Sequence, residues 1–267
     1  PVGYAEIPLD GSAGAPSAHT QRMGITVDDI APARLASLLR DQENTVTRGQ
    51  VLACGLDSAY IRRRLRGGAW RAVYPGIYIT HTGPMTWLQR AWCAVLLAAP
   101  AALSDESALL VASGNADRLG GNDTIHVAIA SGRRITPKPG IAFHHRKNLA
   151  ADTMANAMPP RVRVEEAVLD IAARATTGVA VIAALADPVQ ARLTTAVRLL
   201  TALERRRRIR HRDLMRDVLG DVAGGTCSAL EHRFLTRVER PHGLPSPLRQ
   251  APTTVSKPGF RDLEYPD

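Results

Sequence analysis

The chain has 267 residues, a formal net charge of +9 at pH 7 and a pI of about 10.2. This basic balance favours a polyanionic partner, duplex or other nucleic acid before an anionic membrane surface. Aromatic residues make up only 4% of the chain, which argues against a single-strand binder because such proteins need rings on which bases stack. No apolar run is long enough to cross a bilayer, so we expect no membrane partner.

The three cysteines, Cys54, Cys93 and Cys227, stand far apart in the sequence. No CxxC pair and no metal-ligand spacing occurs among them, so they predict small buried residues in a reducing, cytoplasmic protein. Residues 1–22 are rich in Gly, Pro, Ser and Ala, without the pattern of a signal peptide, and predict a disordered leader.

Two short helices are predicted next. Residues 30–40 place their apolar side chains on one helical face and predict a supporting helix. A second helix begins after Thr47, because Thr47 and Gln50 have the spacing of an N-terminal capping box. Gly55 is placed to end this helix, where a positive φ is needed.

A third, basic helix follows at 58–66, capped by Asp57 or Ser58. Ile61 and Leu65 stand four residues apart and predict its buried face. Arg62 and Arg66 share another face with Arg63 beside them, which predicts an outward positive ridge, and Arg64 adds to the charge of the helix.

Two alternating segments, 70–73 and 77–80, predict a hairpin around the turn 74–76. A short helix, a tight turn, a basic helix and a hairpin have the order of a winged helix-turn-helix, which places one helix in the major groove of DNA. The alternative is a basic helix face that only water contacts. The candidate DNA-binding residues are Arg48, Ser58, Tyr60, Arg62, Arg63, Arg66, Arg71 and Tyr74.

The segments TRGQVLACGL and IRRRLRGGAWRAVYPGIYI, within residues 30–80, resemble the winged-helix domain of the AbiEi family. These proteins are antitoxins of type IV toxin-antitoxin systems and occur as DNA-binding modules in actinobacteria. The resemblance implies a double-stranded DNA partner, repression of transcription, a cognate toxin protein and a homodimer.

The middle of the chain also resembles the second half of AbiEi-type proteins, but the resemblance implies no binding residues there. His144 and His145 are adjacent on a predicted strand and must point to opposite faces, so they cannot ligate one metal ion together. His126 and His145 could approach if their strands pair, but a basic surface near phosphate is the favoured interpretation, and no metal site is predicted. The predicted elements are helices at 85–99, 104–112, 165–174 and 179–203 and strands at 124–130 and 140–145.

A run of six arginines within residues 204–213 is the densest charge in the chain. It has two interpretations, a solvated helix end or a second stripe that contacts phosphates. Each neutralised phosphate would add roughly one unit to the salt dependence of DNA binding.

The C-terminal part predicts a helix at 228–239, a short strand, and a second strand that starts at Phe260. SALEHRFLTRVERPHGLPSPLRQ and FRDLEYPD resemble the start of DUF559 domains, which are related to very-short-patch repair and restriction endonucleases. The resemblance implies that Glu231 and Asp262 are the candidate catalytic acids, and that Mg²⁺ would be the cofactor if the domain were active. Because the next strand with its second acid does not follow, we expect no cleavage.

Together these patterns predict an α+β, mainly α protein. Its expected function is duplex DNA binding in the manner of an antitoxin or repressor, with helix 58–66 in the major groove and no cofactor. The alternatives are a metal-dependent DNA endonuclease and a scaffold that binds a toxin. The expected divisions are a leader at 1–22, a winged helix-turn-helix at 23–82, a middle α/β-helical domain at 83–222 and an incomplete endonuclease-like segment at 223–267.

Overall fold

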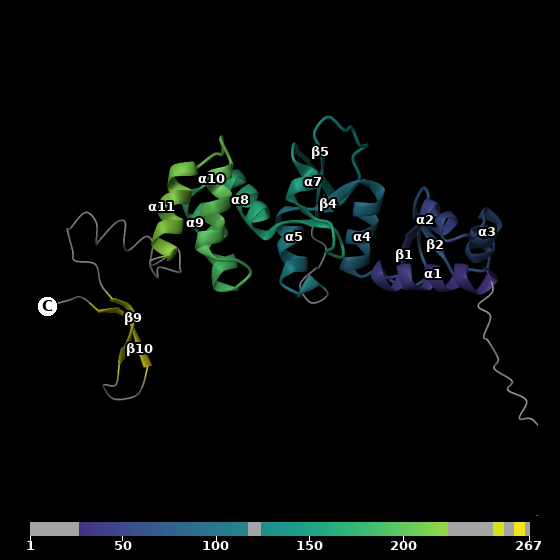
Figure 1. Cartoon of the computed structure of the whole chain (residues 1–267), viewed down its shortest axis with the longest axis horizontal. Coiled ribbons are helices and arrows are strands. Elements are labelled where there is room, and N and C mark those ends of the chain that lie inside the picture. Colours follow the sequence, from purple (N-terminus) through teal and green to yellow (C-terminus); the bar gives the residue numbers. More distant parts are fainter. Residues whose placement is uncertain (1–26, 117–123, 224–247, 254–258, 265–267) are drawn as a thin grey trace, which may run out of the picture.

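The computed structural model describes residues 27–116, 124–223, 248–253 and 259–264. The described residues form a mixed α and β fold with more helix than strand, so the coarse prediction of an α+β protein is confirmed. Their strands form sheets of three, five and two strands. Buried apolar side chains gather in three clusters, which follow one another along the chain and along the long axis of the molecule (Figure 1).

The first cluster, called the N-terminal core, is built from three helices and a small sheet. Two caps predicted from the sequence are present: Thr47 and Gln50 form the capping box of α2, and Asp57 accepts from the Tyr60 N–H at the start of α3. Gly55 has a φ of +96°, as its position after α2 requires. The elements are α1 (Val27–Asp41), β1 (Thr45–Thr47), α2 (Arg48–Ala53), α3 (Ser58–Arg66), β2 (Arg71–Tyr74) and β3 (Ile77–Ile79).

The predicted hairpin gains a third strand that the sequence did not indicate. β3 lies between β1 and β2 and pairs antiparallel with both. Trp70 packs edge-on against Tyr60 of α3 at 5.9 Å between ring centres and lies 6.0 Å from Tyr78 of β3. This aromatic contact fixes α3 against the sheet.

The second cluster, the sheet core, surrounds a five-stranded sheet in the order β6-β5-β4-β8-β7. β5 and β6 are the two predicted strands and pair in parallel, while β4, β7 and β8 were missed because each has only two or three residues. The elements are α4 (Trp87–Leu97), β4 (Ala101–Leu103), α5 (Asp105–Ala112), β5 (Ile125–Ala130), β6 (Ile141–Arg146), α7 (Leu149–Asp152), β7 (Thr153–Met154) and β8 (Arg161–Val162).

The third cluster, the helical core, packs four helices together. The single helix predicted at 179–203 is wrong, because residues 191–195 separate two helices. Arg192 there has a positive φ of 56°, and the Thr195 side chain caps the next helix. The four helices are α8 (Val164–Arg174), α9 (Gly178–Gln190), α10 (Ala196–Arg205) and α11 (Arg212–Ala223).

Helix α8 belongs to two cores, because Ala167 packs in the sheet core and Leu169 in the helical core. Beyond them, β9 (Leu248–Thr253) pairs antiparallel with β10 (Gly259–Glu264). The predicted leader, the helix at 228–239 with Glu231, and the side chain of Asp262 lie outside the described residues. Within the described ranges, every helix is too short or too polar to cross a membrane.

Candidate functional site

The basic helix α3 presents its arginines outward, as its sequence predicted. Ile61 is buried against the N-terminal core and Leu65 is half-buried, whereas Arg62, Arg63, Arg64 and Arg66 are all exposed. At 100° per residue, Arg62, Arg63 and Arg66 fall on the face opposite Ile61. We call these three side chains the α3 ridge. None of them forms an ion pair with any residue that the structure describes.

Tyr60 supports the arginines on one side of α3. The guanidinium carbons of Arg63 and Arg64 lie 5.7 and 5.0 Å from the centre of its ring, within the range of a cation–π contact. The same ring packs on Trp70. Tyr60 therefore connects the basic surface to the N-terminal core, and its ring is only partly accessible.

Two further predicted residues meet at the start of α3. A terminal nitrogen of Arg48 donates to the Ser58 hydroxyl at 2.8 Å. The backbone N–H of Arg48 donates to the Gly76 carbonyl in the hairpin turn at 2.8 Å. These contacts hold the beginnings of α2 and α3 beside the turn between β2 and β3.

The two predicted wing residues do not join this group. Arg71 is exposed and donates to the Gly83 carbonyl at 3.3 Å, in the segment that leads to α4. Tyr74 is half-buried and lies near Cys93 of α4, and burial raises the pKa of its hydroxyl. Both therefore lie towards α4, while the ridge faces away from the core.

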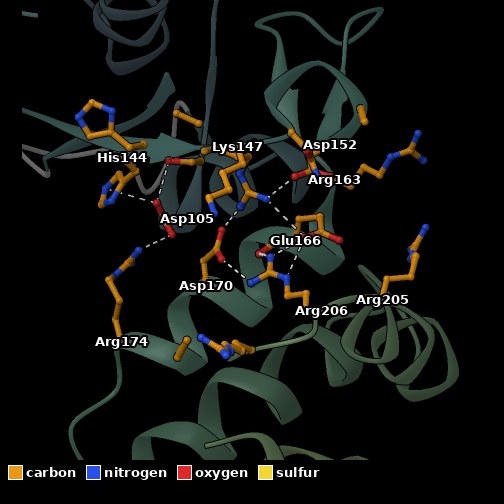
Figure 2. A pocket seen from close by; sticks show the side chains of 18 of the residues that line it. Asp105, His144, Lys147, Asp152, Arg163, Glu166, Asp170, Arg174, Arg205 and Arg206 are labelled. Carbon is orange, nitrogen blue, oxygen red and sulfur yellow. Dashed lines mark hydrogen bonds and ion pairs between the residues drawn. The ribbon is translucent and has the colours of Figure 1, made fainter. Parts of the chain in front are cut away.

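A second polar site lies between the sheet core and the helical core, in a cavity of about 1340 Å³ (Figure 2). Arg146 of β6 donates to Asp152 at 2.7 Å and to Asp170 of α8. Arg206 donates to Asp170 at 2.6 Å and to Glu166 of α8. These paired charges are largely shielded from water. Because their partners stand on β6, on α8 and after α10, they connect the sheet to the helices.

The arginine run at 204–213 is therefore divided between two environments. Arg206 is committed to the carboxylates of α8, and Arg212 donates to Glu204 at 3.0 Å and to backbone carbonyls. The other arginines are exposed: Arg205, Arg207, Arg208 and Arg210. Neither a fully solvated helix end nor a continuous phosphate-contacting stripe describes this arrangement.

The structure also brings together three residues that sequence reasoning did not combine. The sequence suggested that His126 could approach His145, but His145 is exposed. Its neighbour His144 instead places Nε2 2.9 Å from Nδ1 of His126. The same Nε2 lies 3.3 Å from a carboxylate oxygen of Asp105, which is 1% exposed. The alternation of a strand could identify which histidine faces inward, but not its partner on another element.

Burial affects His144 in this cluster of Asp105, His126 and His144. It lowers the pKa of His144, and the nearby carboxylate of Asp105 opposes that shift. Asp105 has a φ of +51°, a region that a non-glycine residue seldom adopts. Arg174 of α8 donates to the Asp105 carboxylate from the other side.

Comparison with known proteins adds little to this geometry. No family model matches the sequence, and no curated protein matches it. A solved structure, the RV2827C protein from Mycobacterium tuberculosis, is similar over 78% of this chain and 80% of its own, with 18% sequence identity and a TM-score of 0.42. A likeness of that degree identifies neither a family nor a function.

Proposed function

We propose that this protein binds duplex DNA through a winged helix-turn-helix made of α1, α2, α3 and the β2–β3 hairpin. Helix α3 is the recognition helix, and its ridge lies in the major groove. A net charge of +9 agrees with a polyanionic partner.

The observation that carries the proposal is the outward α3 ridge, whose exposed arginines form no ion pair with a described residue. Elsewhere in the described chain many arginines meet carboxylates, as Arg146, Arg174 and Arg206 do. The ridge arginines project from a helix whose inner face is fixed by Ile61 and by the stacked Tyr60 and Trp70. Exposed guanidinium groups on a firmly packed helix, unpaired with any described carboxylate, suit phosphates and guanine edges, which accept two hydrogen bonds from one arginine.

Within DNA-binding proteins, the resemblance of residues 30–80 to AbiEi antitoxins favours a repressor of transcription with a toxin partner and a homodimeric form. The endonuclease alternative depends on Glu231 and Asp262. The side chains of both residues lie outside the part of the chain that the structure describes.

A fluorescently labelled mixed-sequence duplex tests the proposal by anisotropy. At about 0.1 M salt each phosphate contact contributes roughly tenfold to affinity through counterion release. We therefore expect Arg62→Ala with Arg66→Ala to weaken binding roughly 30- to 100-fold.

The matched control removes two positive charges from the β5–β6 loop, by Arg134→Ala with Lys138→Ala. Arg134 is exposed and Lys138 is half-buried, and neither is part of α3. We expect this control to change affinity less than about threefold, because a surface charge distant from the DNA is largely screened. Equal losses in the two double variants would show that only net charge matters, and the recognition-helix assignment would be wrong.

A further inference from the structure

The cluster of Asp105, His126 and His144 has the composition and spacing of a metal site. The three potential ligand atoms all lie within 4.8 Å of one another. Ligands bound tetrahedrally at 2.0–2.1 Å stand roughly 3.3 Å apart. The observed separations of 2.9 Å between the two imidazole nitrogens and 3.3 Å between His144 and Asp105 are close to that value.

The sheet topology brings these residues together from three separate elements. Parallel pairing of β5 with β6 sets Ala128 opposite His144, so the two histidines lie on one face, two positions apart in register. β4 runs antiparallel to β5 and leads directly into α5, which begins at Asp105. The Ser104 N–H donates to the His126 carbonyl at 2.9 Å, which fixes this corner on β5.

A second layer of polar groups orients the potential ligands. Nε2 of His126 lies 3.5 Å from a Glu106 carboxylate oxygen, which leaves Nδ1 to face His144. The Ser104 hydroxyl donates at 2.7 Å to the Asp105 oxygen that faces His144, while Arg174 occupies the other oxygen. A carboxylate behind a ligating histidine is the usual arrangement in metal sites, since it fixes the ring and its tautomer.

We propose that Asp105, His126 and His144 bind a divalent transition-metal ion, with Zn²⁺ as the expected ion. Two imidazoles with one carboxylate are a ligand set that suits Zn²⁺ and its first-row neighbours better than Mg²⁺ or Ca²⁺. The negative charges of Asp105 and Glu106 together offset the positive charges of the ion and of Arg174.

The site is also open on one side. Asp105 and His144 line the large cavity shown in Figure 2, whose wall includes exposed arginines such as Arg205 and Arg207. Three protein ligands leave a fourth position for water or an anion, as in open zinc sites. This site shares no residue with the α3 ridge.

Titration of the chelator-treated full chain with Co²⁺, followed by visible absorption and then by displacement with Zn²⁺, tests the proposal. We expect one Co²⁺ per chain in the wild type. His126→Gln and His144→Gln should each weaken binding at least about 100-fold, and Glu106→Gln roughly tenfold, as a change behind the ligands does.

The control is His145→Gln, the exposed neighbour of His144 on the same strand. We expect it to bind Co²⁺ as the wild type does. Equal binding by the wild type and the two ligand variants, or an equal loss in His145→Gln, would overturn the proposal in favour of a hydrogen-bonded cluster without metal. If a ligand variant does not fold, zinc X-ray absorption of the wild type decides: imidazole in the zinc shell supports the site, and its absence refutes it.

Discussion

Arg206 and Arg207 are neighbours in the sequence, but they stand in different environments. Arg206 is half-buried and donates to Glu166 and Asp170 of α8, whereas Arg207 is exposed. Removing one partner of a buried ion pair leaves uncompensated charge, which costs far more than the loss of a surface charge. The two arginines should therefore differ in their effect on stability.

We predict that Arg206→Ala lowers the free energy of unfolding by about 2–4 kcal/mol, because Glu166 and Asp170 then share only Arg146. Arg207→Ala, which removes the same charge, should change it by less than about 0.5 kcal/mol. Urea denaturation followed by circular dichroism measures both. Equal destabilisation would mean that the α8 carboxylates do not hold the helices to the sheet.

At the level of secondary structure, the turn from α2 to α3 depends on a glycine. Gly55 has a φ of +96°, and an added Cβ would lie 3.6 Å from Ala31 Cβ, an ordinary contact. The left-handed backbone, not crowding, therefore makes glycine necessary there. Gly49 in α2 has helical geometry and room for a Cβ, 3.9 Å from the Thr47 hydroxyl oxygen.

Gly55→Ala should lower the free energy of unfolding by about 1–2 kcal/mol through backbone strain. Gly49→Ala, the matched control, should leave it unchanged or raise it by up to about 1 kcal/mol. Thermal unfolding of the two variants makes the comparison. If Gly55→Ala unfolds with the same free energy as the wild type, residue 55 does not need the left-handed backbone that the turn between α2 and α3 shows.

The elements that the sequence predicted well are those determined by nearby residues. The capping box of Thr47 and Gln50, the bounds of α3, and the presence of strands β5 and β6 follow from spacing over a few positions. Strands of two or three residues, such as β4 and β8, form only because a longer neighbour pairs with them. Local patterns do not carry that information.

The two candidate sites also differ in how far the sequence could predict them. The α3 ridge could be predicted because one helix contains all of it. The cluster of Asp105, His126 and His144 could not, because its members come from α5, β5 and β6 and meet only when the sheet has formed. The positive φ at Asp105 leaves no signature in the sequence.

Across the whole molecule, the ridge and the histidine cluster belong to different cores, which are joined through α4. Gln89 of α4 donates to the Glu43 carbonyl at 3.0 Å and lies 3.2 Å from His81, so it connects α4 to the N-terminal elements. Helix α3, which carries the ridge, lies near one end of the row of cores (Figure 1). A long duplex can therefore contact that end without covering the middle of the protein.

The salt dependence of duplex affinity tests the central claim most directly, because its slope counts the phosphates that the protein neutralises. If Arg62 and Arg66 each contact one phosphate, the slope of log K against log salt for Arg62→Ala with Arg66→Ala should be shallower than that of the wild type by about 1.8. The Arg134→Ala, Lys138→Ala control should keep the wild-type slope. Identical slopes for the wild type and the Arg62, Arg66 variant would contradict the assignment of α3 as the helix that binds DNA.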